Sequence, residues 1–103
     1  MIVKELKERG SLISGEEGHQ FRSGYVILAK GEEVGEHSTT GGEELLLILE
    51  GKAEVRSGSQ TSVVVAQAMV LIPTFTVHNV RNVGETELRY VYMVSTVGAP
   101  NQK

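Results

Sequence analysis

Glycine is the residue that most constrains this chain, because it interrupts the sequence at short intervals. Twelve glycines and only two prolines occur among the 103 residues. Between the glycines lie short runs rich in valine, isoleucine, leucine and tyrosine, which are residues that favour β-strands. Short apolar runs separated by turn residues are typical of β-sandwiches and closed barrels. The sequence therefore predicts an all-β fold. The expected strands span residues 25–29, 44–50, 53–56, 62–66, 69–72, 77–80 and 88–94.

The length of the chain allows one domain, since independent domains usually run to about 100–150 residues. We expect a single domain over residues 1–103, with the core barrel at about 20–97. An N-terminal arm precedes it, and the periodicity of residues 3–9 leaves open whether the arm holds a helical turn or a strand. Residues 98–103 have nothing to bury, so we expect a frayed tail.

Composition excludes several classes of partner and site. The chain has no cysteine, which excludes a disulfide framework and a thiolate metal site, so any metal must bind through nitrogen and oxygen. Its formal charge of −3 includes no basic cluster, which argues against nucleic acid as a partner. No apolar run reaches the roughly 20 residues that span a bilayer, and residues 1–5 lack the apolar segment of a signal peptide. We expect no membrane association and a cytoplasmic location.

The expected strand at 44–50 is apolar on both faces, because alternate residues of a strand point to opposite sides of its sheet. Glu44 heads one face, which continues in Leu46 and Ile48, while the other face carries three leucines. Residues 88–94 repeat this pattern. An apolar face on the outside of a barrel must be covered by another sheet or another subunit. In so short a chain we expect the cover to be a second copy, which predicts a homodimer.

Two histidines and one carboxylate form the constellation that points to chemistry. If residues 40–41 form the turn of a hairpin, His37 lies opposite Glu44, with Cβ atoms about 4.5–5.5 Å apart. A carboxylate on an apolar face is costly unless a cation or a donor meets it. His78 adds a second imidazole from another expected strand. Two imidazoles and one carboxylate suit Fe(II), Mn(II), Co(II), Ni(II) or Zn(II) and leave coordination positions open.

The spacing of the residues around His37 and Glu44 resembles a known sequence motif. Five, one, four and six residues separate Gly31, His37, Thr39, Glu44 and Gly51. This stretch resembles the first motif of the cupin superfamily, G-x5-H-x-H-x(3,4)-E-x6-G, in every position but one, since Thr39 stands where the second histidine belongs.

A second stretch resembles the second cupin motif, G-x5-P-x-G-x2-H-x3-N. Pro73, His78 and Asn82 match it, while Gln67 and Phe75 replace its two glycines. The two motifs with their spacer cover residues 31–82, about half of the chain. The resemblance implies a double-stranded β-helix, also called a jelly-roll or cupin barrel.

The resemblance also implies His37, Glu44 and His78 as ligands of one divalent metal ion per chain, of unknown identity among Fe, Mn, Ni, Co and Zn. Thr39 is expected to face the same site, where its neutral hydroxyl is a poor ligand and would orient a bound water. Tyr92 is a second candidate for a catalytic role, because a phenol near a metal is a hydrogen-bond donor or weak general acid.

Small single-domain cupins support several activities, so the fold leaves the function open. The sequence favours a protein that acts on or binds a small molecule at a 2-His-1-carboxylate site, as a dioxygenase-type oxidoreductase or an isomerase if it is an enzyme. The alternative is a non-catalytic module that binds a metabolite or a sugar, or serves as a sensor.

Several residues keep alternative interpretations. His37 and Glu44 could form a metal-free pair that ties the hairpin, and a slip of one residue would make Glu43 the inward carboxylate. His19 lies outside both motifs and is expected at the surface. Gln20 and Arg22 could bind an anionic substrate, but the surface of an edge strand is the favoured interpretation.

Overall fold

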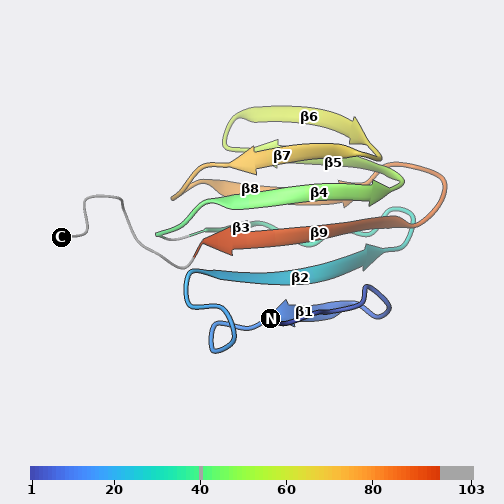
Figure 1. Ribbon diagram of the computed structural model, residues 1–103. Helices are drawn as coiled ribbons and strands as arrows, with labels where there is room; N and C mark the ends of the chain where they lie inside the picture. Colours follow the sequence, from blue (N-terminus) through green and yellow to red (C-terminus); the bar gives the residue numbers. More distant parts are fainter. Residues whose placement is uncertain (40, 96–103) are drawn as a thin grey trace.

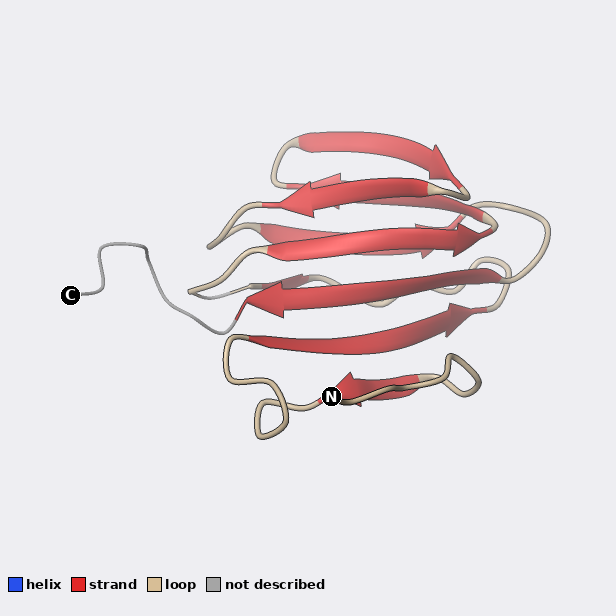
Figure 2. Cartoon of the chain, viewed as in Figure 1, coloured by secondary structure: helices blue, strands red, loops and turns tan. Residues whose placement is uncertain are grey.

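The computed structural model describes residues 1–39 and 41–95, and this part of the protein contains nine β-strands joined by turns and loops (Figures 1 and 2). That part contains no helix, and so none that could cross a membrane. The frayed tail expected at 98–103 lies outside the described residues. The prediction of an all-β fold is confirmed.

The strands form two antiparallel sheets. The five-stranded sheet has the order β1-β2-β9-β4-β7, and the four-stranded sheet has the order β3-β8-β5-β6. In chain order the strands are β1 (Gly10–Ile13), β2 (Phe21–Leu28), β3 (His37–Ser38), β4 (Glu44–Glu50), β5 (Lys52–Ser57), β6 (Gln60–Val65), β7 (Ala68–Ile72), β8 (Val77–Asn82) and β9 (Leu88–Ser95). Figure 1 shows β4, β7 and β9 in front of β5 and β8, so the sheets stand face to face.

All seven expected strands are present, and β4 has the expected bounds. The two strands that the sequence analysis missed are β1 and β3. Both are short, with four and two residues, and neither carries an alternating apolar pattern that could be recognised in the sequence. Residues 1–9 form neither the helical turn nor the arm strand that the periodicity left open.

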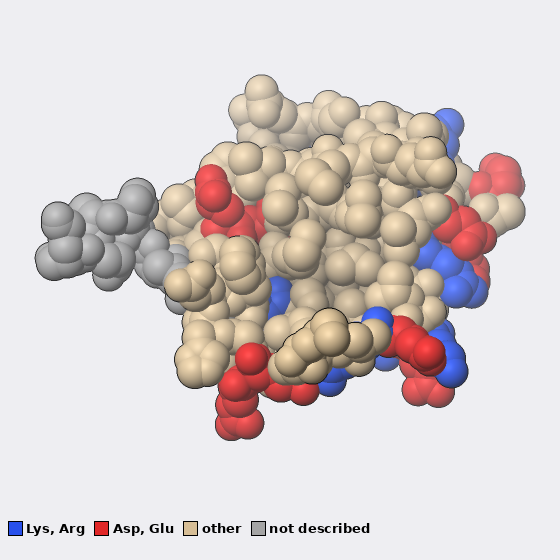
Figure 3. Space-filling view, viewed as in Figure 1, with Lys and Arg blue, Asp and Glu red and all other residues tan. Residues whose placement is uncertain are grey.

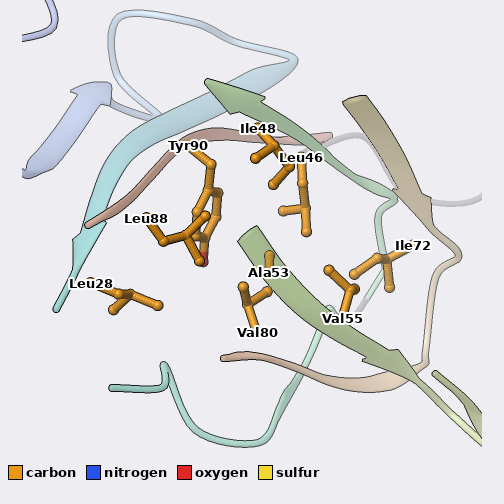
Figure 4. Packing of buried hydrophobic residues seen from close by; sticks show 9 residues of the cluster. All are labelled: Leu28, Leu46, Ile48, Ala53, Val55, Ile72, Val80, Leu88 and Tyr90. Atoms are coloured by element: carbon orange, nitrogen blue, oxygen red, sulfur yellow. The ribbon is translucent and has the colours of Figure 1, made fainter. Parts of the chain in front are cut away.

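The core fills the space between the two sheets (Figure 4). In β4 the inward residues Leu46 and Ile48 are fully buried, whereas the outward Leu45 and Leu47 are half-buried. The buried cluster combines aliphatic side chains with one tyrosine: Leu28, Leu46, Ile48, Ala53, Val55, Ile72, Val80, Leu88 and Tyr90. Burying a leucine or isoleucine side chain contributes about 1.5–3 kcal/mol each, so this cluster is the main stabilising element of the fold.

Asn82, the last residue of the second motif, has a structural role. Its side-chain amide nitrogen donates to the carbonyl oxygens of Leu28 (3.0 Å) and Thr86 (2.9 Å), and its side-chain oxygen accepts from the Gly84 amide (2.9 Å). The side chain is buried, and it satisfies backbone groups that the β8–β9 loop leaves unpaired. Asn82 therefore holds this loop against the end of β2.

Two residues other than glycine adopt the left-handed backbone conformation. They are Gln67, with φ of 69°, and Phe75, with φ of 57°. These are the two positions at which the chain departs from the glycines of the second motif. The backbone thus keeps the conformation that glycine favours, although a Cβ atom makes this conformation costly.

Candidate metal centre

Three strands bring the candidate ligands together. His37 of β3 pairs directly with His78 of β8 in the four-stranded sheet, while Glu44 begins β4 in the facing sheet. The expected hairpin between His37 and Glu44 is therefore wrong, because β3 pairs with β8 and β4 pairs with β7 and β9. The chain crosses between the sheets here, and Gly42 lets it pass so close to the Ser95 carbonyl oxygen that a Cβ atom would collide.

The three side chains meet at one end of the space between the sheets. One donor atom from each of His37, Glu44 and His78 lies within 4.8 Å of the others. Nε2 of His78 is 2.9 Å from Oε1 of Glu44. The two imidazole rings have centroids 4.1 Å apart and meet at 61°. His78 and Glu44 are buried and His37 is exposed, so the site has a closed side and an open side.

Backbone carbonyls fix the orientation of both imidazoles. Nδ1 of His37 lies 2.9 Å from the Gly35 oxygen, and Nδ1 of His78 lies 2.9 Å from the Thr76 oxygen. A carbonyl oxygen only accepts, so each Nδ1 carries the hydrogen and each neutral ring presents Nε2 as a lone pair. Metal-binding histidines are usually held in this manner.

The contact between His78 and Glu44 provides a test of whether a cation fits. With Nδ1 protonated, a neutral His78 directs the Nε2 lone pair at a carboxylate oxygen, so the pair needs a shared proton or a cation. A divalent ion meets that need with nitrogen and oxygen ligands. An ion bound at about 2.0–2.2 Å bridges donors at most about 4.4 Å apart, which is close to the 4.8 Å within which the three donor atoms lie.

Thr39 is buried beside this pair, as expected from its place two residues after His37. Its hydroxyl donates to Oε1 of Glu44 at 3.0 Å. We expected the hydroxyl to orient a water, whereas the structure shows it positioning the carboxylate itself. The hydrogen bond holds Oε1 toward His78, which restricts the rotamer of Glu44.

A cavity of about 360 Å³ adjoins the site, and His37, Thr39 and Glu44 line it, whereas the fully buried His78 does not. Tyr90 and Tyr92 line it together with Val26, Val80 and Val94. The ring of Tyr92 lies over Gly24, where a Cβ atom would come within 2.5 Å of the Tyr92 hydroxyl. Burial raises the pKa of Tyr90, with smaller contributions from Glu44 and Tyr92, so its phenol stays protonated.

The family model of the Cupin domain matches residues 24–94, which is more than half of the chain and includes both motifs. The chain belongs to the cupin family. A curated relative of this cupin, polyketide synthase CurC from Streptomyces cyaneus, is 35% identical over 72 residues, which are 70% of this chain and 47% of the relative. The chain thus spans about half the length of that relative.

Solved structures share the cupin fold. The cupin domain of Cnp3 from Schizosaccharomyces pombe superposes with a TM-score of 0.78 and 24% identity, covering 85% of this chain and 63% of that one. A predicted oxalate decarboxylase from Thermotoga maritima gives a TM-score of 0.80 and 24% identity, covering 84% of this chain and 77% of that one. The expected jelly-roll barrel is confirmed.

The structure of this cupin also decides two of the open alternatives. Glu44 is buried and Glu43 is exposed, so Glu44 is the inward carboxylate. His19 is exposed, as expected, and is not among the residues that line the cavity.

Arg22 is exposed, as expected, and it also lines the cavity. The edge-strand part of the interpretation is wrong, because β2 lies between β1 and β9, although the pairing with β1 ends at Ser23, next to Arg22. Gln20 precedes the strand and is exposed. The alternation of inward and outward residues in β2 could have placed Arg22 with Val26, but the sequence did not show where the strand begins.

Proposed function

We propose that this protein is a metal-binding cupin that holds one divalent ion at His37, Glu44 and His78 and binds a small molecule in the adjacent cavity. The observation that carries the proposal is the convergence of these three donor groups, within 4.8 Å, beside a cavity of about 360 Å³ that His37 and Glu44 line. Ligand sites in proteins usually occupy about 300–1,000 Å³, so the cavity suits a small ligand.

An ion held by two imidazoles and one carboxylate supplies Lewis-acid chemistry and open positions for a substrate or for oxygen. The residues of the chain then have separate tasks. His78 and Glu44 hold the buried side, His37 holds the open side, and Thr39 positions Glu44. Tyr92 directs a phenol at the cavity wall, where it can donate to an oxygen of the ligand. We favour a dioxygenase-type oxidoreductase, which uses Fe(II) or Mn(II) in such a site.

A second candidate is a binding module without turnover, for a sugar or another metabolite. It is favoured by the hydrogen bonds around Glu44, because Oε1 accepts from Thr39 and shares a proton with His78 in a network that is satisfied without an ion. In that case the cavity binds its ligand through the tyrosines and the polar residues of the wall.

Metal analysis and oxygen uptake separate the two candidates. We expect about one divalent ion per chain after purification without chelator, and turnover or oxygen uptake with a small oxygen-bearing substrate that stops on addition of a chelator. A ligand that raises the melting temperature of chelator-treated protein and is recovered unchanged would instead identify the binding module.

We also propose that the protein is a homodimer. The outer face of the five-stranded sheet carries Leu45 beside Leu71 and Leu47 beside Met69. Leu71 and Met69 are 55% and 61% exposed, and Figure 3 shows uncharged side chains across the centre of this face, with charged ones mainly at its lower and right margins. Exposed apolar side chains on this face fit a second copy of the same face. A cytoplasmic location stays a prediction, and cell fractionation tests it.

A further inference from the structure

We propose that Arg22 is the anchor for a carboxylate, so that the ligand of the cavity is a small organic acid. Its carboxylate pairs with Arg22 on the β2 side, and its other oxygen donors lie toward His37 and Glu44, where the candidate metal site meets the cavity. The inference rests on the proposed function, because it assigns the chemical class of ligand for the same cavity.

The register of the five-stranded sheet places Arg22 level with the candidate metal site. Glu44 of β4 pairs with Val94 of β9, and Val94 pairs with Arg22 of β2. Residues in one such row point to the same face of a sheet, so all three project toward the cavity, which they line. Neighbouring strands lie about 4.8 Å apart, which puts the backbones of Glu44 and Arg22 roughly 10 Å from each other. A ligand of a few carbon atoms spans the space between their side chains.

The guanidinium of Arg22 has no partner among residues 1–39 and 41–95. By contrast, Arg56 pairs with Glu36, and Arg89 pairs with Glu87. Arg22 is also the one lysine or arginine among the residues that line the cavity. Arg22 is exposed where it lines the cavity, and an unpaired guanidinium there is suited to a carboxylate, because its fork of N–H donors matches the two carboxylate oxygens.

The charges around the cavity favour an anion. Glu36, which also lines it, is neutralised by Arg56. A divalent ion more than balances Glu44, so with Arg22 the loaded cavity carries a net positive charge although the whole chain is at −3. Charges of one sign in a cleft raise the local concentration of ligands of the opposite sign.

The cavity also supplies a second donor and an apolar middle. The hydroxyl of Tyr92 lies over Gly24, two residues from Arg22 on the same face of β2, so phenol and guanidinium lie on the same side of the cavity. Val26, Val80 and Val94 line the remainder. These features fit an acid with a short hydrocarbon segment.

The test uses four acids of increasing length, which are oxalate, malonate, succinate and glutarate, and succinamide as a neutral analogue of succinate. Binding to protein loaded with Zn(II) is measured by calorimetry for the wild type and for Arg22→Gln and Arg22→Lys. Arg81→Gln is the matched control, because Arg81 is exposed on the outer side of the facing sheet and is outside this cavity.

We expect at least one acid to bind the wild type, and Arg22→Gln to weaken it by about tenfold or more, which corresponds to about 1.4 kcal/mol. The acid affinity of Arg22→Lys should lie between those of the wild type and Arg22→Gln, because lysine keeps the positive charge but lacks the paired N–H donors of the guanidinium. Arg81→Gln should match the wild type, and succinamide should not respond to Arg22→Gln. Equal binding of all four acids by the wild type and Arg22→Gln, or no binding by either, overturns the proposal.

The zinc content of each sample is measured as well. A chain that binds no zinc contradicts the proposed metal site, whereas a zinc-loaded chain whose acid binding ignores Arg22 contradicts only the anchor. Repeating the titrations on chelator-treated protein further separates the metal site from the anchor, since the contribution of Arg22 to acid binding should persist without a metal.

Discussion

Nε2 of His78 lies 2.9 Å from Oε1 of Glu44, although the two residues are 34 positions apart in sequence and belong to facing sheets. Both are buried, and His78 receives no other contact to this nitrogen from the described residues. Two electron-rich atoms held together in the interior need a positive charge between them. A metal ion bound at the proposed site would replace the proton that the pair otherwise shares, and its binding should stabilise the fold.

We predict that His37→Ala, Glu44→Ala and His78→Ala each abolish stoichiometric metal binding, because each removes one of three ligands. His19→Ala is the matched control and should bind like the wild type, since His19 lies outside the site. Titration of chelator-treated protein with Zn(II) or Mn(II) gives the stoichiometry. Folded variants that keep the metal content of the wild type would show that the three residues are structural.

Thr39→His should tighten metal binding by about tenfold or more, which corresponds to about 1.4 kcal/mol. Thr39 is buried and within 3.0 Å of Glu44, so an imidazole there is directed at the same ion and adds a strong nitrogen ligand. It also fills an open coordination position. If substrate or oxygen uses that position, activity falls as affinity rises.

Thr39→Ser is the control, because it keeps the hydroxyl that positions Glu44. Competition with a chelator of known affinity measures the change. An unaltered metal affinity in folded Thr39→His protein would mean that residue 39 does not face the ion.

The sequence was sufficient to predict most strands and the candidate ligands, because local rules determine both. Alternation of apolar residues gave the bounds of β4, and motif spacing pointed to His37, Glu44 and His78. The pairing of strands depends on contacts between distant parts of the chain. For that reason the hairpin between His37 and Glu44 was wrong, and the partners of β3 and β4 could not be derived from local turn residues.

The same limit explains why the sequence did not place Arg22 at the cavity. Its charge favoured a surface position, and it is exposed, but only the row formed by Arg22, Val94 and Glu44 shows that it shares a face with the candidate site. The hydrogen bond from Thr39 to Glu44 could not be predicted from the sequence either. Thr39 follows β3 of one sheet and Glu44 begins β4 of the other, so their contact depends on how the two sheets face each other.

The homodimer predicts a mass in solution of twice 11.2 kDa. Leu71→Glu should give a monomer, because it places a carboxylate in the apolar face without disturbing the core, from which Leu71 points away. Val63→Glu is the control, since Val63 is 52% exposed on β6 of the other sheet. Light scattering at micromolar concentration measures all three proteins. A wild type of 11.2 kDa would contradict the dimer.

Gln67→Gly should stabilise the protein, although glycine usually destabilises a folded chain. At φ of 69° Gln67 carries the cost of a Cβ atom in the left-handed region, about 1–2 kcal/mol. Glycine removes that cost and adds an entropic cost of about 0.5–1 kcal/mol, so the balance is stabilising by up to about 1.5 kcal/mol. The backbone hydrogen bond from Gln67 to the Ile48 carbonyl oxygen (2.7 Å) is retained, because it does not involve the side chain.

The matched control for this prediction is Gln60→Gly, on β6. Gln60 is also an exposed glutamine, but its φ is not positive, so the substitution carries only the entropic cost and should destabilise by about 0.5–1 kcal/mol. In a domain of this size about 1 kcal/mol shifts the melting temperature by roughly 4–8 °C. In thermal unfolding, the melting temperature should therefore rise for Gln67→Gly and fall for Gln60→Gly. A fall for both variants would show that Gln67 is not strained, and that its side chain makes a compensating contribution which glycine loses.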